Sequence, residues 1–430
     1  WMRDVGLART DVYWTNVYPF QPPANKIEAV PKHELEAWVE QLHTRLGELT
    51  DPWVLVPTGN TALQALTGKR RILKHRGSIY EYHDTRDRRV KVISTIHPAA
   101  VFRTPGWERR CRADWRRIST DATFRELRLP ERQHLSRPTL SDCQDFLAQA
   151  QTAEALALDI ETPSGDVDCL AFATDPSCSL TIPTVGWYWH GDLDPVWKGI
   201  RALCELPVPK VTQNGHYDAF HLAQHDIRLR AWTWDTLAMH HCLDPLDAHD
   251  LAYMASIDTR QPYWKDEAKD PEEAAKYASN IDALWTYNGI DAAVTLELAQ
   301  VYQARLRERG LIPFYERHYR QLFLPLLALM LRGVRLDERR RRQRYTRLTA
   351  ALITAQDRLT VLAGEPLYAK KDLSTKRLAR FLYETLRLPK VIDRATGKVT
   401  TKEVAVRRLM LRFPDKLNEA GTLILDHRRK

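Results

Sequence analysis

Four acidic residues and one tyrosine carry the clearest chemical signal in this chain. Asp159 and Glu161 lie in LALDIET, Asp218 lies in NGHYD, and Tyr287 and Asp291 lie in YNGID. Apolar residues alternate with the first two acids, which indicates a buried strand with Asp159 and Glu161 on one face. Tyr287 and Asp291 are four residues apart in a long helical pattern, so they stack on one helix face. The spacing predicts that these side chains meet at a common site.

A cluster of this kind requires a cation. Carboxylates that repel one another are costly to desolvate unless a positive charge joins them. Oxygen ligands without His or Cys nearby favour Mg²⁺ or Mn²⁺ over zinc. We therefore expect two such ions and two-metal chemistry on a phosphodiester bond.

The DIET, NGHYD and YNGID segments, taken together and in this order, resemble the 3′–5′ exonucleases of the DEDD superfamily. The subgroup is the one whose third motif is Tyr-x-x-x-Asp, and the resemblance covers roughly residues 138–310. It implies that Asp159, Glu161 and Asp291 hold one ion beside an attacking water. Asp159, with outer-shell contacts from Asp218, would hold a second ion beside the leaving 3′ oxygen, and Tyr287 would orient the water.

Other polar residues of this region receive supporting or structural roles. Asn214, in the second motif, is expected to order the site or contact the substrate. Asp235 is interpreted as structural, because Trp232 and Trp234 beside it suggest packing. The histidines lack the paired spacing of a zinc site and are interpreted as surface or core residues; they are His216, His221, His225, His240, His241 and His249.

The element pattern around these motifs predicts a mixed sheet with helices on both sides, the ribonuclease H-like architecture that the resemblance implies. The expected strands are residues 155–162, 168–174, 178–183 and 210–213, and the expected helices are 196–206 and 216–225, with a mostly helical remainder after Asp235.

The N-terminal part resembles the family 4 uracil-DNA glycosylases, which have a three-layer α/β fold. The matching pieces are TNV at 15–17, PPAN at 22–25 and HPAA at 97–100. The resemblance implies that Asn16 bonds a flipped uracil and that His97 stabilises the oxygen of the departing base.

This part departs from the glycosylase pattern at its cysteines. The first cysteine is Cys111, so we expect no iron–sulfur cluster. The motif that binds the attacking water would precede Trp1, and the N-terminus is expected to be incomplete. An active glycosylase and a structural or DNA-guiding domain both remain open.

The C-terminal segments LMLRGVRLDE, DLSTKRLARFLYETLRLPK and TTKEVAVRRL resemble the opening of family A DNA polymerases, where the palm begins and the thumb forms. Two long helices hinged at Gly333 are expected. The residues expected to contact DNA phosphates are Arg339, Arg340, Arg341, Arg342, Arg344, Lys370, Lys371 and Lys376. An arginine-rich hairpin for protein association is the alternative. The chain contains no recognisable palm or fingers motif, so polymerase activity requires a longer protein.

Charge and composition agree with nucleic-acid chemistry. Residues 151–310 carry 12 Lys and Arg against 25 Asp and Glu, whereas residues 311–430 carry 28 against 12. This segregation fits metal binding in the centre and phosphate binding at the flanks. Six scattered cysteines and the lack of a long apolar run or signal peptide indicate a reducing interior and no membrane. We expect the cytoplasm of a bacterial or phage-infected cell.

The predicted organisation is a multidomain α/β chain. It comprises a glycosylase-like domain at 1–125, a linker at 126–137, an exonuclease domain at 138–312 and the palm base and thumb at 313–430. The order resembles the family A replicative polymerases of some large phages, with DNA (primer-template and single-stranded 3′ ends) as the partner and replisome partners unknown. The alternatives are a stand-alone 3′–5′ exoribonuclease, a glycosylase–exonuclease repair fusion and a non-enzymatic DNA-binding adaptor.

Overall fold

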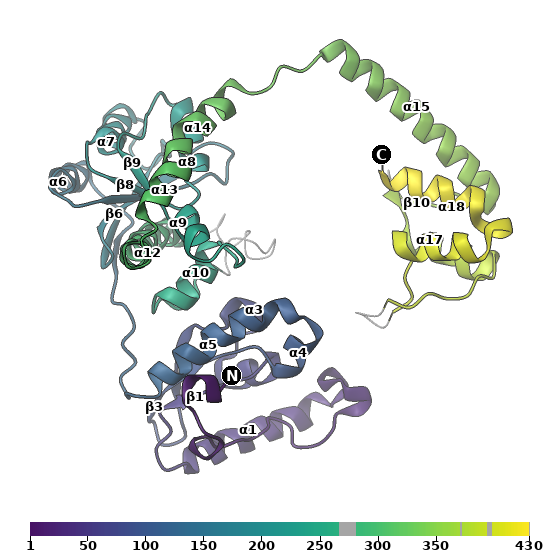
Figure 1. Ribbon diagram of the computed structural model, residues 1–430, viewed down its shortest axis with the longest axis horizontal. Helices are drawn as coiled ribbons and strands as arrows, with labels where there is room; N and C mark the ends of the chain where they lie inside the picture. Colours follow the sequence, from purple (N-terminus) through teal and green to yellow (C-terminus); the bar gives the residue numbers. More distant parts are fainter. Residues whose placement is uncertain (266–280, 370–371, 394–397, 430) are drawn as a thin grey trace. The chain divides into compact units, whose positions relative to one another are not determined.

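The computed structural model describes residues 1–265, 281–369, 372–393 and 398–429. The chain divides into two compact units, Trp1–Arg332 and Gly333–Lys430. The first unit holds two α/β domains, each built on its own sheet, and the second is mainly helical (Figure 1). The boundary expected between residues 312 and 313 lies inside the first unit.

The N-terminal domain has three layers. Its strands are β1 (Val54–Leu55), β2 (Ile79–His83) and β3 (Arg89–Ile93), and its α-helices are α1 (Lys32–Glu48), α2 (Asn60–Thr67), α3 (Ile72–His75), α4 (Pro98–Arg103) and α5 (Glu108–Asp121). The sheet order is β1-β3-β2, with β1 parallel and β2 antiparallel to β3.

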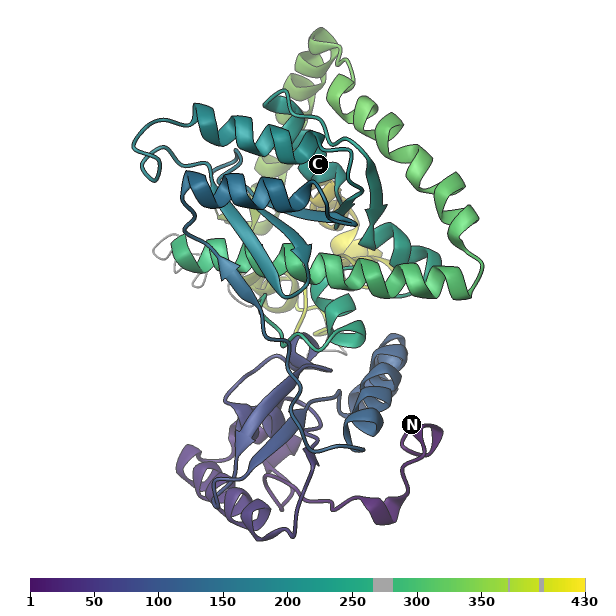
Figure 2. The same cartoon turned by 90° about the vertical axis from the view of Figure 1, so that its left-hand side faces the viewer.

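This domain has two hydrophobic cores, one on each face of the sheet, because successive side chains of β3 point to opposite faces. Val90 and Val92 of β3 pack in one cluster with Leu42 and Leu46 of α1. Ile93, on the opposite face of β3, packs in a second cluster with the α5 residues of that core. The sheet therefore lies between α1 and α5 (Figure 2).

The central domain has a six-stranded mixed sheet in the order β4-β7-β6-β5-β8-β9. The strands are β4 (Gln133–Leu135), β5 (Leu156–Glu161), β6 (Cys169–Asp175), β7 (Cys178–Pro183), β8 (Lys210–Thr212) and β9 (Trp232–Asp235). The α-helices are α6 (Leu140–Ala150), α7 (Asp194–Glu205), α8 (His216–Gln224), α9 (Thr236–Leu243), α10 (Leu251–Asp258), α12 (Ile281–Glu308), α13 (Ile312–His318) and α14 (Phe323–Arg332).

Helix α12 lies across β5, β6 and β7 on one face of this sheet, and α6 and α7 cover the other face (Figure 2). The sheet is therefore buried on both sides, which explains why its central strands are almost continuously apolar. Asp159 and Glu161 interrupt that apolar run on β5.

The expected strands and helices of this domain are confirmed, with ends that differ by at most a few residues. The linker expected at 126–137 contains an unforeseen strand, β4, which pairs in parallel with β7 as an edge strand. Its three residues, Gln-His-Leu, are too few for a periodic pattern. Backbone pairing decides their conformation instead, as in the 2.8 Å bond from Gln133 N to Ser177 O.

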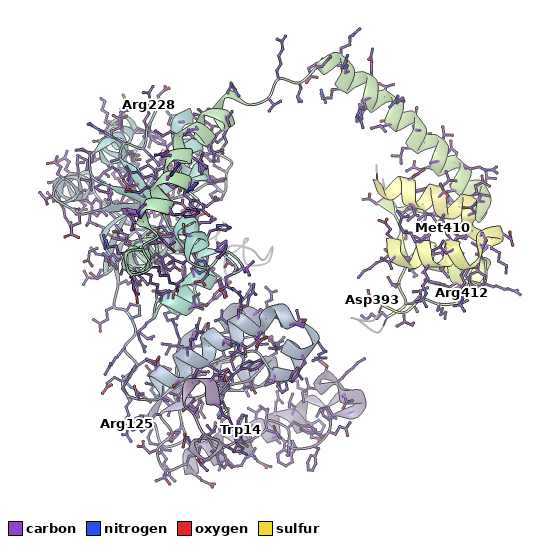
Figure 3. The ribbon with its side chains drawn as sticks, in the orientation of Figure 1. Trp14, Arg125, Arg228, Asp393, Met410 and Arg412 are labelled. Carbon is purple, nitrogen blue, oxygen red and sulfur yellow. The ribbon has the colours of Figure 1, made fainter. Side chains whose placement is uncertain are left out.

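The second unit begins at Gly333, whose φ of 64° ends α14. Its elements are α15 (Glu338–Ala363), β10 (Tyr368–Ala369), β11 (Asp372–Leu373), α16 (Thr375–Arg380), α17 (Glu403–Arg412) and α18 (Pro414–Arg429). The expected break at Gly333 is therefore confirmed, but the expectation of a long helix before it is wrong: α13 ends at His318, a 3-10 turn spans Arg320–Leu322, and α14 has only ten residues. Helices α17 and α18 approach closely where a Cβ on Gly421 would lie 2.5 Å from the sulfur of Met410, which Figure 3 labels.

Helices in the described ranges all fall short of the length and apolarity needed to cross a bilayer.

Candidate active site

Three of the predicted acids form one cluster. Asp159 and Glu161 come from β5 and Asp291 comes from α12, the helix that crosses this strand. One carboxylate oxygen from each residue lies within 4.8 Å of the other two. Strand alternation turns the first two side chains toward α12, which brings Asp291 to them. Among the described residues this is the single group of three or more potential metal ligands.

The charges in this cluster oppose one another. Burial, and then repulsion from Asp291 and Glu161, raise the pKa of Asp159 well above its usual range. Burial, and then repulsion from Asp291, raise the pKa of Glu161 to about 8. The carboxylates therefore favour protons unless a cation lies nearby.

Lys265 supplies one positive charge to the cluster. Its Nζ donates to a carboxylate oxygen of Asp291 and, at 2.9 Å, to the hydroxyl of Tyr287. Burial acts to lower the pKa of Lys265, but the attraction of Asp291 and Asp159 outweighs it, so the pKa is raised and the ammonium group stays charged. Trp264, the preceding residue, donates its indole N–H to the other oxygen of Asp291 at 2.6 Å.

Tyr287 lies one turn before Asp291 on α12, as its spacing predicts, and is 8% exposed. Its hydroxyl accepts a bond from the Nζ of Lys265, and the same Nζ donates to Asp291. The ammonium group of Lys265 therefore bridges the two side chains.

Asp218 supports the cluster from behind. It lies in the first turn of α8, and its Oδ1 accepts a 3.1 Å bond from the backbone N–H of Ile160, between Asp159 and Glu161. Burial, and then repulsion from Asp159, raise the pKa of Asp218. It is absent from the three-carboxylate group. Its contact fixes the β5 backbone that presents the two acids.

Asn214 is exposed and has a φ of 59° in the turn between β8 and α8. The same turn is held by Asp235, whose carboxylate accepts bonds from Thr212 Oγ1 at 2.9 Å, Gly215 N at 2.8 Å and Ala238 N at 3.1 Å. Asp235 thus caps α9 and ties it to β8. These contacts agree with its structural interpretation.

Asn288, Trp264 and Lys265 belong to the site but were not predicted. Asn288 is fully buried, and its Nδ2 donates to Asp159 Oδ2 at 2.7 Å. A signal for Asn288 existed, because it lies inside YNGID on the same helix as Asp291. Trp264 and Lys265 lie 27 and 26 residues before Asp291, and no local pattern connects them to it.

Within the described residues, five of the six histidines have hydrogen-bond partners; among them, His216 Nε2 bonds the backbone oxygen of Phe323 at 3.1 Å, whereas His221 Nδ1 is buried without one. His240 bonds His249 through their Nδ1 atoms at 2.7 Å, His241 bonds the Tyr319 hydroxyl at 2.6 Å, and His225 bonds a carboxylate oxygen of Asp166 at 2.8 Å.

In the N-terminal domain, Asn16 and His97 are both exposed. The backbone oxygen of Asn16 accepts a 3.3 Å bond from Arg45. His97 is the N-cap of α4, where its Nδ1 accepts from Ala99 N at 3.1 Å. Both residues therefore hold loops through backbone contacts. Trp14, near Asn16 in sequence, lies under the Arg9 guanidinium at 5.1 Å (Figure 3).

The predicted phosphate contacts lie on exposed surfaces where the structure describes them. Five arginines occupy the first turns of α15, and they are Arg339, Arg340, Arg341, Arg342 and Arg344. Arg341 pairs with Glu338 at 2.7 Å. Lys376 is exposed on α16. Lys370 and Lys371 lie outside the described residues.

Comparison with known proteins finds a family match at the N-terminal end of the chain. Residues 1–118 match the uracil DNA glycosylase superfamily. A type-4 uracil-DNA glycosylase of Archaeoglobus fulgidus is 33% identical over 122 residues, which cover 27% of this chain and 59% of that protein.

Two polymerases extend the similarity. The DNA polymerase I of Pseudomonas aeruginosa is 27% identical over 287 residues, covering 61% of this chain and 30% of that protein. The DNA polymerase of Bacillus phage SP01 is 30% identical over 98 residues, covering 23% of this chain and 10% of that protein. The chain therefore spans less than a third of either polymerase. It carries a uracil DNA glycosylase superfamily domain at its N-terminus and is homologous to family A DNA polymerases of phages and bacteria.

Proposed function

We propose that the central domain is a 3′–5′ exonuclease that hydrolyses DNA with Mg²⁺ or Mn²⁺, as the proofreading part of a family A DNA polymerase. The observation that carries this proposal is the convergence of Asp159, Glu161 and Asp291 within 4.8 Å, next to a tyrosine hydroxyl. The relatives named as DNA polymerases favour DNA over RNA as the substrate.

The donor set suits a hard divalent cation. All three ligands are carboxylates, and the raised pKa values of Asp159 and Glu161 reflect a deficit of positive charge that a divalent ion would offset. Asp159, Glu161 and Asp291 would hold the ions. When bound, such ions neutralise developing charge and make water a nucleophile near neutral pH.

The residues around the cluster hold the three carboxylates in position and set the charge around them. Asp218 holds the β5 backbone at Ile160, which keeps Asp159 and Glu161 directed toward α12. Asn288 orients the Asp159 carboxylate. Tyr287, whose hydroxyl accepts a bond from Lys265, would orient the attacking water by hydrogen bonding.

The flanking domains would hold DNA. Exposed arginines on α15 support phosphate binding by the second unit, both to primer-template duplex and to DNA near a single-stranded 3′ end. For the N-terminal domain a DNA-guiding role without an iron–sulfur cluster is favoured over base excision, because its sole cysteine in residues 1–125 is the buried Cys111.

The test is hydrolysis of single-stranded DNA labelled at the 5′ end, so that products shorten from the 3′ end. Activity should require Mg²⁺ or Mn²⁺ and disappear in EDTA. Asp159→Ala should reduce kcat by several orders of magnitude, whereas Asp145→Ala, which removes an exposed acid of α6, should match the wild type. Equal rates in EDTA and Mg²⁺ would exclude the metal mechanism. Faster hydrolysis of RNA than of DNA would favour the exoribonuclease alternative.

A further inference from the structure

The segment Thr259–Lys265 connects the N-terminal domain to the acidic cluster, and we call it the strap. It follows α10 and has no helix or strand of its own. Its position therefore depends on side-chain and backbone contacts at its two ends, and these ends touch different domains.

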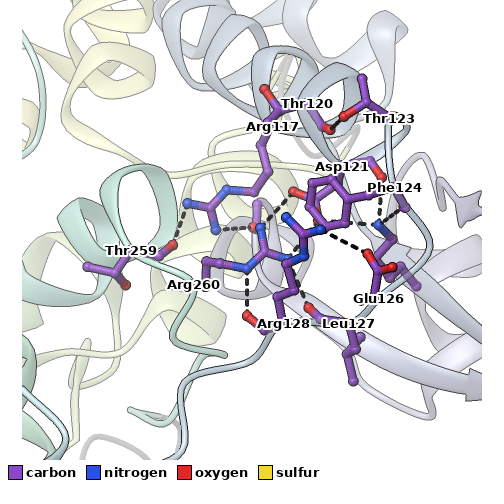
Figure 4. Close-up of polar contacts among 12 residues, drawn as sticks. Arg117, Thr120, Asp121, Thr123, Phe124, Glu126, Leu127, Arg128, Thr259 and Arg260 are labelled. Carbon is purple, nitrogen blue, oxygen red and sulfur yellow. Dashed lines mark hydrogen bonds and ion pairs between the residues drawn. The ribbon is translucent and has the colours of Figure 1, made fainter.

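The first end of the strap is held through Arg260 by the N-terminal domain and by the segment that directly follows it. The guanidinium donates to both carboxylate oxygens of Asp121 at 2.7 and 3.1 Å, to Leu127 O at 2.8 Å and to Arg128 O at 2.7 Å (Figure 4). Asp121 is 1% exposed. A two-oxygen guanidinium–carboxylate pair on a buried acid fixes direction as well as distance.

Further bonds surround this pair. Arg117 of α5 donates to the backbone oxygen of Thr259 (Figure 4). It also donates to the backbone oxygen of Gly77 at 3.0 Å. The backbone N–H of Tyr263 donates to Ser78 Oγ at 3.2 Å. Contacts with the N-terminal domain therefore continue along the strap to the residue before Trp264.

The junction beneath the strap is closely packed. Arg76 is buried, pairs with Asp114 of α5, and donates to Ser256 Oγ of α10 at 3.0 Å. A Cβ on Gly77 would lie 2.8 Å from Ser256 O. Because the backbones of Gly77 and Ser256 meet this closely, α10 and the strap that follows it have little room to shift relative to the N-terminal domain.

The second end of the strap reaches Asp291. Trp264 donates to one carboxylate oxygen of Asp291 at 2.6 Å, and Lys265 donates to the other. Both oxygens of this predicted metal ligand are thus oriented by adjacent residues of one segment. Partners that orient a ligand in this way commonly change metal affinity or activity by about 10- to 100-fold when removed.

We propose that the N-terminal glycosylase-like domain is a positioning support for the exonuclease site: it anchors the strap through Arg260, and the strap uses the Trp264 indole N–H to orient Asp291. Trp264 is then a positioning residue and not a catalytic one. This inference rests on the proposed exonuclease function, but its central claim concerns the orientation of a ligand and has a readout that needs no hydrolysis.

The experiment compares three variants of the full chain. Arg260→Ala releases the strap at its distant end, Trp264→Phe keeps an aromatic ring but removes the donor, and Arg228→Ala removes an exposed arginine of the central domain as the matched control. Each is measured for Mn²⁺ affinity by electron paramagnetic resonance and for kcat and KM on single-stranded DNA. Hydrogen exchange reports release of residues 259–265.

Arg260→Ala and Trp264→Phe should each weaken Mn²⁺ binding and lower kcat by about tenfold at limiting Mn²⁺, with KM for DNA unchanged. Saturating Mn²⁺ should restore most of kcat, which a general loss of structure would not allow. The double variant should fall short of the product of the two single effects, because both changes act through Asp291. Arg228→Ala should match the wild type.

Two results separate failure of this inference from failure of the proposed function. The inference would be overturned, and the proposed function left intact, if Trp264→Phe kept the wild-type kcat and Mn²⁺ affinity. The same holds if Arg260→Ala kept both values while hydrogen exchange in the strap became faster. Absence of metal-dependent hydrolysis in the wild type would overturn the proposed function, and the Mn²⁺ affinities would still decide whether the strap orients Asp291. If Arg260→Ala fails to fold, Arg260→Lys takes its place, because it keeps the positive charge but removes the two-oxygen pair with Asp121, and Trp264→Phe still decides whether the indole orients Asp291.

Discussion

Asp159 and Glu161 lie in a buried cluster of like charges, so their ionisation depends on nearby cations. Burial and repulsion raise their pKa values in the folded protein, that of Glu161 from 4.5 to about 8. A raised carboxyl pKa favours the folded state fully below the unfolded value, and this contribution is lost as pH rises through the folded value. Without metal, stability should therefore fall between about pH 4.5 and pH 8.

The corresponding prediction is that Mg²⁺ stabilises the protein more at pH 8 than at pH 5, because the ion binds ionised carboxylates and protons compete with it. Urea unfolding in EDTA and in Mg²⁺ at the two pH values measures the difference. Glu161→Gln should reduce the pH dependence in EDTA. Equal stabilisation by Mg²⁺ at both pH values would contradict this account.

Tyr287 belongs to the same scale but acts differently. Tyr287→Phe removes the hydroxyl that Lys265 contacts and leaves the three carboxylates in place. We expect kcat to fall by roughly 10- to 100-fold, with metal affinity nearly unchanged, whereas Asp159→Ala should lose both. Single-turnover hydrolysis and Mn²⁺ titration distinguish these effects. A defect in Tyr287→Phe as deep as that of Asp159→Ala would assign the hydroxyl a larger role.

At the scale of elements, the placement of α12 on the sheet decides whether the acids meet. Gly289 permits the close approach: a Cβ there would lie 2.7 Å from Ser179 Oγ and 3.2 Å from Thr181 Oγ1 of β7. These are short side chains of a central strand, so they cannot move aside easily.

Gly289→Ala should cost about 1–3 kcal/mol through overpacking. The gain in helix propensity is roughly 1 kcal/mol, so we expect a net destabilisation of up to about 2 kcal/mol. It should also lower exonuclease activity by displacing Asp291. Gly199→Ala in α7 is the matched control, because a Cβ there meets nothing within 4 Å, and it should stabilise slightly. Thermal unfolding of both variants provides the measurement. Stabilisation by Gly289→Ala would show that α12 has more room than this packing indicates.

Helix α15 and the rest of the second unit carry the largest positive charge. Residues 333–430 contain 25 Lys and Arg against 11 Asp and Glu. Each phosphate neutralised on duplex DNA adds about 0.9 to the slope of log affinity against log salt. Truncation after Arg332, where the first compact unit ends, should flatten this slope and leave hydrolysis of short oligonucleotides largely intact. A slope that survives truncation would assign duplex binding to the first unit.

At the scale of the whole molecule, the glycosylase-like domain is expected to support and guide more than to excise. The N-terminal domain should contain no iron and should remove uracil weakly or not at all, because residues 1–125 have a single cysteine and it is buried. The measurements are iron content and excision from uracil-containing single-stranded DNA, with His97→Ala as the control. Robust excision that disappears in His97→Ala would identify a repair activity in this domain.

The sequence by itself determined the placement of those site residues that share one strand or one helix, because their spacing follows the period of that element. A period of two placed Asp159 and Glu161 on one face of β5, and a spacing of four placed Tyr287 above Asp291 on α12. It also located the main strands, the helix break at Gly333 and the basic turns of α15, since these depend on apolar alternation, glycine and charge in short windows.

Only the tertiary structure decided which distant groups touch these residues. Strand β4 pairs within the expected linker, Asp218 bonds the β5 backbone, and Trp264 and Lys265 contact Asp291 from a segment without regular structure. The Arg260–Asp121 pair joins residues 139 positions apart. Such contacts arise from how sheets, helices and domains pack, and no local period records them, because each depends on the placement of two backbones that are remote in the chain.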